Sequence, residues 1–170
     1  MKKLARLTAL LLTGVMLLLL ASCGAAPLTP EQQARQEIFN AINEVRKDKG
    51  MPSLLEVPKL TQLEQEFIEH FREAGTKGIP LSEAKQLEQE LFNKQEKAGW
   101  KNTGGINYSN SNPAKLEFVY KGDTPEFRKE LIQLGFVGLI DDDPSIALSV
   151  GVVTIDGEIY WTASILEPKT

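Results

Sequence analysis

Cysteine and histidine are almost absent from this chain. Its 170 residues include one cysteine, Cys23, and one histidine, His70. A single thiol cannot form an intramolecular disulfide, so packing has to stabilise the fold. A single imidazole cannot supply a metal centre or catalytic pair that needs two histidines. These two scarcities exclude disulfide-stapled scaffolds and histidine-rich metal sites within one chain.

Long apolar runs are also scarce, with one exception at the start of the sequence. A nearly unbroken apolar stretch extends from Leu7 to Leu20, after three basic residues and before Ala21 and Ser22. This layout is typical of a secretory signal. The stretch has about 14 residues, whereas a membrane-spanning helix needs about 20. A single transmembrane anchor is therefore the weaker interpretation.

The end of this signal, Leu20-Ala21-Ser22-Cys23, resembles the bacterial lipobox. The resemblance implies that Cys23 carries fatty acids, palmitate among them, and becomes the first residue of the mature protein. We then expect a cell-membrane lipoprotein of the envelope, outside the cytoplasm. The residue after Cys23 is Gly24, not the aspartate that retains many lipoproteins in the inner membrane. In a cell with two membranes, we therefore expect the protein in the outer membrane, on the periplasmic side. An ordinary secreted protein with an incidental cysteine is the alternative.

These features divide the chain into a signal peptide over residues 1–22, a lipidated tether over 23–29 and one domain over 30–170. Removing the signal leaves 16 basic against 23 acidic residues, a net charge of −7. An acidic surface argues against nucleic acid as a partner and against electrostatic docking on anionic lipid.

Helical periodicity dominates the first half of the domain. Thr29-Pro30-Glu31-Gln32 reads as a capping box with proline at the first helical position. The spacing of apolar residues predicts helices over about 30–49, 58–74 and 82–97, and a shorter one over about 125–134. Glu64, Glu66 and Glu69 are dense on the second helix, where the sequence does not distinguish a carboxylate pair from a charged face.

Strand patterns dominate the end of the chain. Two β-rich runs, Ile146 to Ile155 and Glu158 to Leu166, flank Asp156-Gly157, which predicts a hairpin. A further short apolar run covers 136–140, and 113–121 fits either a helix or a strand. Residues 100–112 read as a loop with at most a short strand at 106–108. The fold class is therefore α+β, an α-β-α sandwich with N-terminal helices packed on a C-terminal antiparallel sheet.

Several segments resemble the CAP superfamily, the SCP-like extracellular domains. The helix segment with Asn43 and Arg46, followed by Gly50 to Leu54, is similar to its opening helix and "GLPPL" loop. Segments 126–132, 149–153 and 159–162 are similar to its "GHRxNIL", "IGVGV" and "YYWTQ" motifs. The resemblance covers roughly residues 37–166 and implies an α-β-α sandwich with a central cleft.

The departures from the family concern the cleft. The family's two histidines and its glutamate would fall at Phe127, near Thr76-Lys77-Gly78 and at Gly105. None of these can supply the metal site that the resemblance implies, so we expect a degenerate CAP-like domain. We predict no catalytic residues, no metal and no cofactor.

Five aromatic side chains are candidates to line a groove for an apolar or peptide ligand, with core packing as the alternative. They are Trp100, Tyr108, Phe118, Tyr120 and Phe127. His70 reads as a solvated helix residue, and Asp141-Asp142-Asp143 as a turn rather than a calcium loop.

The sequence thus predicts a membrane-anchored envelope lipoprotein whose domain binds or interacts and is not an enzyme. Its partner would be the membrane, through the anchor, and an envelope protein, a lipid or a wall component. Two alternatives stay open: a hydrolase with a rewired cleft around His70, and a carrier of small apolar ligands.

Overall fold

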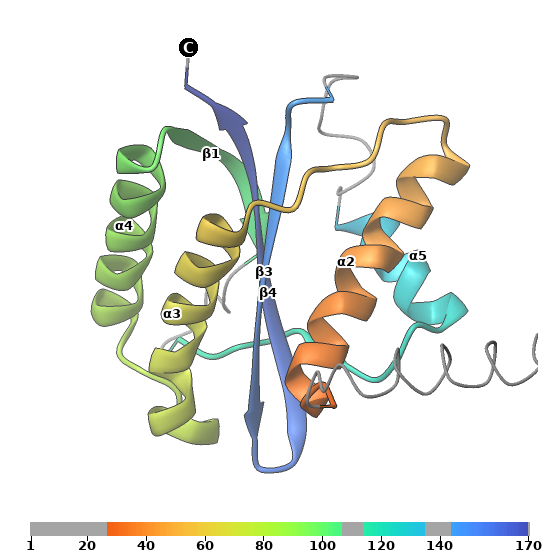
Figure 1. Ribbon diagram of the computed structural model, residues 1–170. Helices are drawn as coiled ribbons and strands as arrows, with labels where there is room; N and C mark the ends of the chain where they lie inside the picture. Colours follow the sequence, from red (N-terminus) through yellow and green to blue (C-terminus); the bar gives the residue numbers. More distant parts are fainter. Residues whose placement is uncertain (1–26, 107–113, 135–143, 170) are drawn as a thin grey trace, which may run out of the picture.

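The computed structural model describes residues 27–106, 114–134 and 144–169, which form an antiparallel sheet between two layers of helices (Figure 1). Helices α3 and α4 cover one face of the sheet, and α2 and α5 cover the other. The predicted α+β class, with helices packed on an antiparallel sheet, is confirmed. In chain order the elements are α2 (Pro30–Asp48), α3 (Pro58–Ala74), η1 (Gly75–Lys77), α4 (Leu81–Lys97), β1 (Trp100–Ile106), β2 (Val119–Tyr120), α5 (Pro125–Gln133), β3 (Ala147–Ile155) and β4 (Glu158–Pro168).

Strand β4 is the centre of the sheet. It pairs with β3 along one side, and with β1 and then β2 along the other, all antiparallel. The β3–β4 hairpin turns at Asp156 and Gly157, which both have positive φ as the predicted two-residue turn requires. Strand β3 therefore has one paired side and one outer edge within the described sheet.

Both faces of the hairpin are buried, which divides the core in two. Even-numbered residues of β3, such as Val150 and Val152, lie in the cluster that contains Trp161 and the apolar stripe of α2. Odd-numbered residues, such as Val153, lie in the cluster that contains the inner faces of α3 and α4. This explains why β3 reads as a continuous apolar run rather than an alternating one.

The loop between α2 and α3 is fixed by two polar side chains of α2. The Asn43 side chain accepts from the Leu54 backbone N–H at 2.8 Å and donates to the Leu54 carbonyl at 3.3 Å. Arg46 is fully buried, and its Nε donates to the Pro52 carbonyl at 3.0 Å. The loop then pairs with the outer edge of β3, where Leu55 forms an isolated parallel bridge to Ala147. Asn43 and Arg46, which belong to one of the motifs of the family resemblance, thus hold the loop between α2 and α3 in place.

Two sequence expectations change. The prediction of a loop over most of 100–112 is wrong for Trp100–Ile106, which forms β1 and pairs with β4. Gly104 and Gly105 have low strand propensity, but the backbone of β4 supplies partners along this edge. In the described part of the ambiguous segment 113–121, Ala114 forms an isolated bridge to Ile79, Val119–Tyr120 forms β2, and no helix is present. The expected strand at 136–140 and the turn at 141–143 lie outside the described residues.

Helix α3 lies close to β3 at Gly151, where the absence of a side chain permits the contact. A Cβ atom at Gly151 would lie 2.7 Å from the Glu64 carbonyl oxygen, 3.0 Å from its carbonyl carbon and 3.1 Å from Ile68 Cγ2. Two of these atoms belong to helix backbone, which cannot move aside without shifting the whole of α3. The glycine thus sets the distance between helix and sheet.

We therefore predict that Gly151→Ala lowers the free energy of unfolding by about 1–3 kcal/mol, because the new methyl group forces α3 away from β3. Gly104→Ala is the matched control, since a Cβ there meets nothing within 4 Å. Urea unfolding followed by circular dichroism measures both. Equal stability of the two variants would contradict the close approach.

Candidate functional site

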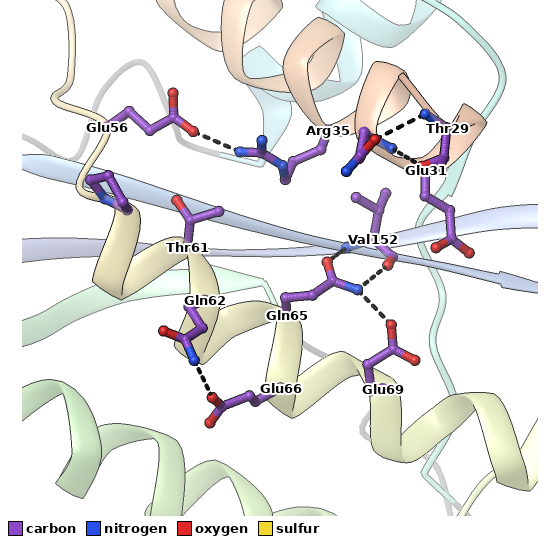
Figure 2. Close-up of a pocket in the computed structure, with 12 residues that line it drawn as sticks. Thr29, Glu31, Arg35, Glu56, Thr61, Gln62, Gln65, Glu66, Glu69 and Val152 are labelled. Atoms are coloured by element: carbon purple, nitrogen blue, oxygen red, sulfur yellow. Dashed lines mark hydrogen bonds and ion pairs between the residues drawn. The ribbon is translucent and has the colours of Figure 1, made fainter. Parts of the chain in front are cut away.

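A groove of about 730 Å³ lies between α2 and α3, above the outer edge of β3 (Figure 2). Helix α2 forms one wall, α3 forms the other, and Val152 of β3 lies at the bottom. The volume is within the range of small-molecule and peptide pockets. Ten of its twelve lining residues have polar or charged side chains, although apolar atoms contribute most of the lining surface. They are Thr29, Glu31, Gln32, Arg35, Glu56, Pro58, Thr61, Gln62, Gln65, Glu66, Glu69 and Val152.

At the bottom of the groove, a side-chain amide takes the place of a neighbouring strand. Gln65 Nε2 donates to the Val152 carbonyl at 2.7 Å, and the Val152 N–H donates to Gln65 Oε1 at 3.1 Å. A neighbouring strand would make the same two hydrogen bonds with a β3 residue whose backbone N–H and C=O point away from β4. Figure 2 shows the Gln65 amide reaching from α3 to β3 in this way.

Two residues further along β3, a charged pair covers the same edge. The Thr154 N–H donates to Glu31 at 2.7 Å, and Arg72 Nη1 approaches the Thr154 carbonyl at 3.4 Å. Arg72 also bonds both Glu31 and Glu69. At Val152 and Thr154 the outer edge is thus satisfied by side chains, a common protection against unwanted strand pairing.

These contacts lower the pKa of two groove carboxylates, Glu31 and Glu69. Partial burial by itself would raise the pKa of Glu31, but hydrogen bonds from Arg72 and Thr154 lower it overall. The hydrogen bond from Arg72 also lowers the pKa of Glu69, against the smaller effect of burial. An ionised carboxylate accepts hydrogen bonds and attracts cations, so both groups suit ligand binding.

The rim of the groove carries two more ion pairs. Arg35 contacts Glu56 at 2.6 Å, and Lys94 contacts Glu66 at 3.4 Å. All four side chains are substantially exposed, so these pairs are weak and screened by salt. The lining itself has four carboxylates and one guanidinium. Arg72, Lys94 and Lys59 bond lining residues from outside, so the acidic excess belongs to the lining itself.

Next to Gln65, Glu64 points the other way, beneath α3. It is fully buried against the small residues Ser149, Thr162 and Ser164 of the sheet. Ser149 Oγ donates to Glu64 Oε2 at 3.1 Å. The hydroxyls of Thr162 and Ser164 also approach the carboxyl, but without full hydrogen-bond geometry. Glu64 and Gln65 are adjacent on α3. Glu64 therefore contacts the face of β3, and Gln65 contacts its edge.

Burial raises the pKa of Glu64 from 4.5 to about 7, and this is the largest influence on it. The hydroxyls of Ser164, Thr162 and Ser149 oppose the rise, whereas the negative charge of Glu88 on α4 adds to it. The sequence contains a signal for this burial. Glu64 lies in the apolar stripe of α3, between Leu60 and Phe67, at helical spacing.

The aromatic residues considered as groove-lining lie elsewhere. Phe118 and Phe127 pack edge-to-face on Trp161 at 5.9 and 5.8 Å, and Tyr120 packs on Phe127 at 5.1 Å. Tyr120 and Phe127 are buried, and the Tyr120 hydroxyl donates to Glu37 at 2.8 Å. Trp100 packs against the other core cluster, and Tyr108 lies outside the described residues. The structure thus brings three of the five together, in the core rather than in the groove.

The remaining candidate positions do not converge. His70 is exposed on α3 and lies beside Glu83 and Glu90 of α4. Of the positions equated with the family's cleft, Phe127 is in the core beneath α2 and α5, Gly105 lies against the Ala163 carbonyl of β4, and Lys77 is exposed in η1. Across the described ranges, no three potential ligands among His, Cys, Asp and Glu are grouped to hold a metal ion.

Comparison with protein-family models, with curated proteins and with solved structures gives no match to this chain. The groove and the residues around it therefore have to be interpreted from their own chemistry.

The pKa of Glu64 gives a pH prediction. Because the folded state binds this proton more tightly than the unfolded state, the free energy of unfolding should fall as pH rises from about 4.5 to above 7. The fall is about 3 kcal/mol for a rise from 4.5 to about 7 in pKa. Glu64→Gln, which stays neutral, should abolish it and be more stable than wild type at pH 8.

Urea unfolding at pH 5, 6, 7 and 8 measures this slope. Glu66→Gln, the exposed carboxylate two residues away, is the control and should keep the wild-type slope. A wild-type stability that is flat or rises over this range would contradict the raised pKa.

Proposed function

We propose that this protein is a lipid-anchored envelope lipoprotein whose domain binds a partner rather than catalysing a reaction. Acylated Cys23 would hold the domain at the membrane surface, outside the cytoplasm. The domain would be a degenerate CAP-like one. Its partner would be a component of the envelope, met at the groove between α2 and α3.

The arrangement of the N-terminus supports the anchor. The lipobox-like Leu20-Ala21-Ser22-Cys23 is followed, six residues after the cysteine, by the Thr29 cap of α2. Thr29 accepts from the Gln32 N–H and Gln32 accepts from the Thr29 N–H, so the predicted capping box is present. In the part of the chain that the structure describes, no helix is both long enough and apolar enough to span a bilayer.

The chemistry of the groove supports binding, and this observation carries the proposal. Its groups are amides, a strand edge and carboxylates whose low pKa keeps them ionised, as for Glu31 and Glu69. Such carboxylates are poor proton donors at neutral pH, but they hold cationic and hydrogen-bonding ligands well. The CAP-like part rests on the motif resemblance together with the helices on both faces of the sheet.

The anchor is tested in cells grown with radiolabelled palmitate. We expect the wild-type protein to incorporate label and to fractionate with membranes, because two or more acyl chains anchor a protein stably. Cys23→Ser should lose the label and change its fractionation. Ser22→Ala is a matched control that leaves the cysteine in place. An unlabelled wild-type protein, free in the medium, would contradict the proposal.

The proposal that the domain does not catalyse a reaction is tested separately. The purified wild-type protein should show no turnover of ester, peptide or glycan substrates that is lost in His70→Ala, the residue on which the alternative hydrolase depends. Turnover that disappears in this variant would replace the proposed binding role by the hydrolase.

A further inference from the structure

We propose that the groove between α2 and α3 binds an extended peptide segment with basic residues at alternate positions, which pairs with the outer edge of β3 at Val152. The inference rests on the proposed binding function and names the class of partner. The peptide backbone would replace the Gln65 amide and add a strand to the sheet.

The first argument is the state of the β3 edge. Several residues of β3 direct their backbone N–H and C=O groups to the outer edge. Leu148 bonds the Leu55 backbone, Val152 bonds the Gln65 amide, and Thr154 bonds the Glu31–Arg72 pair. Only the first of these partners is backbone. The side-chain amide of Gln65 makes the two bonds of a strand residue without the remaining ladder, so a peptide that offers a continuous backbone can exchange with it.

The second argument is that the chain already pairs with this edge. The Leu55 N–H donates to the Ile146 carbonyl at 2.8 Å, and the Leu148 N–H donates to the Leu55 carbonyl at 2.9 Å. The loop thus supplies one residue of a parallel strand before it turns away into α3 at Pro58. The groove begins where this loop leaves the edge, at Glu56 and Pro58, and residues of α2 and α3 line it (Figure 2).

The third argument is charge. Side chains of an added strand alternate between the two faces of the sheet, so every second one would point to the wall formed by α3. That wall carries Glu66 and Glu69, and Glu31 lies across from them on α2. Four carboxylates and one guanidinium line the groove itself, and the whole chain has a net charge of −4. This balance favours a basic segment and opposes an acidic one.

The test uses the full-length protein in detergent and three synthetic capped hexapeptides. One alternates Lys and Val, and the second and third replace Lys by Ser and by Glu. Fluorescence anisotropy of labelled peptides should show binding in the order Lys, Ser, Glu, and added salt should weaken the Lys peptide. The N–H groups of the Lys and of the Val residues point to opposite edges of an extended peptide, so two further peptides carry N-methyl groups on Val only and on Lys only. One of the two should bind about tenfold or more weakly, because strand pairing needs the backbone donors on the edge that faces β3.

Variants separate strand pairing from simple attraction between charges. Gln65→Ala opens the Val152 backbone groups and should tighten binding of the Lys peptide about tenfold. Gln89→Ala on α4 is the matched control, because its exposed amide bonds Asn93 outside the groove, and it should change the affinity less than about twofold. Circular dichroism checks that both variants keep the fold.

Four results would overturn the inference. These are no binding by wild type or Gln65→Ala, undiminished binding of both N-methylated peptides, preference for the Glu peptide, or self-association of Gln65→Ala without peptide binding, which would make a second copy of the chain the occupant. None of these bears on palmitate incorporation at Cys23. Failure of the anchor and failure of the peptide site are therefore distinguishable.

Discussion

The structure depends on how α3 is held against β3. Gly151 lets the helix backbone come within contact of the strand, and two neighbouring residues of the helix then bond it from two directions. Glu64 reaches the hydroxyls on the face, and Gln65 reaches the backbone at the edge. Each contact restricts how far the helix can rotate on the sheet. Together they fix its rotation, which in turn fixes the width of the groove and the direction of its α3 wall.

This arrangement has an energetic conflict. A carboxyl without a cationic partner among its closest neighbours is costly to bury in charged form, and an apolar residue of similar size would fit the stripe of α3 without that cost. In return, a polar contact has only a few geometries that satisfy it, whereas apolar contacts tolerate sliding. The Glu64 cluster therefore contributes to a unique register of helix on strand at the expense of stability near neutral pH.

The sequence was a good guide where local chemistry decides structure. Helix ends follow from Thr29, Pro30, Pro58 and Thr124, whose caps and fixed φ angles act within one turn. The hairpin follows from Asp156-Gly157 in the same way. Strand β1 could not be predicted, because Gly104 and Gly105 become strand only when β4 is beside them. That pairing joins residues about sixty positions apart, and no local pattern records it.

The groove was still harder to foresee. Gln65 and Glu31 look like ordinary polar residues of amphipathic helices, since nothing in their neighbourhood shows that each will meet the edge of a distant strand. Glu64 is different, because its place in an apolar stripe indicated burial, yet the density of acids around it also fitted an exposed charged face. The aromatic residues gave the opposite lesson: Phe118, Tyr120 and Phe127 do gather, but around Trp161 in the interior.

The position of Thr29 has one more consequence. This residue both caps α2 and lines the groove, and only six residue steps separate it from Cys23. A fully extended chain of that length reaches about 20 Å. An acylated Cys23 would therefore confine the groove to a thin layer above the lipid headgroups. Encounters would then take place by lateral diffusion in two dimensions, and neighbours tethered to the same leaflet would meet the groove far more often than molecules dissolved in the bulk.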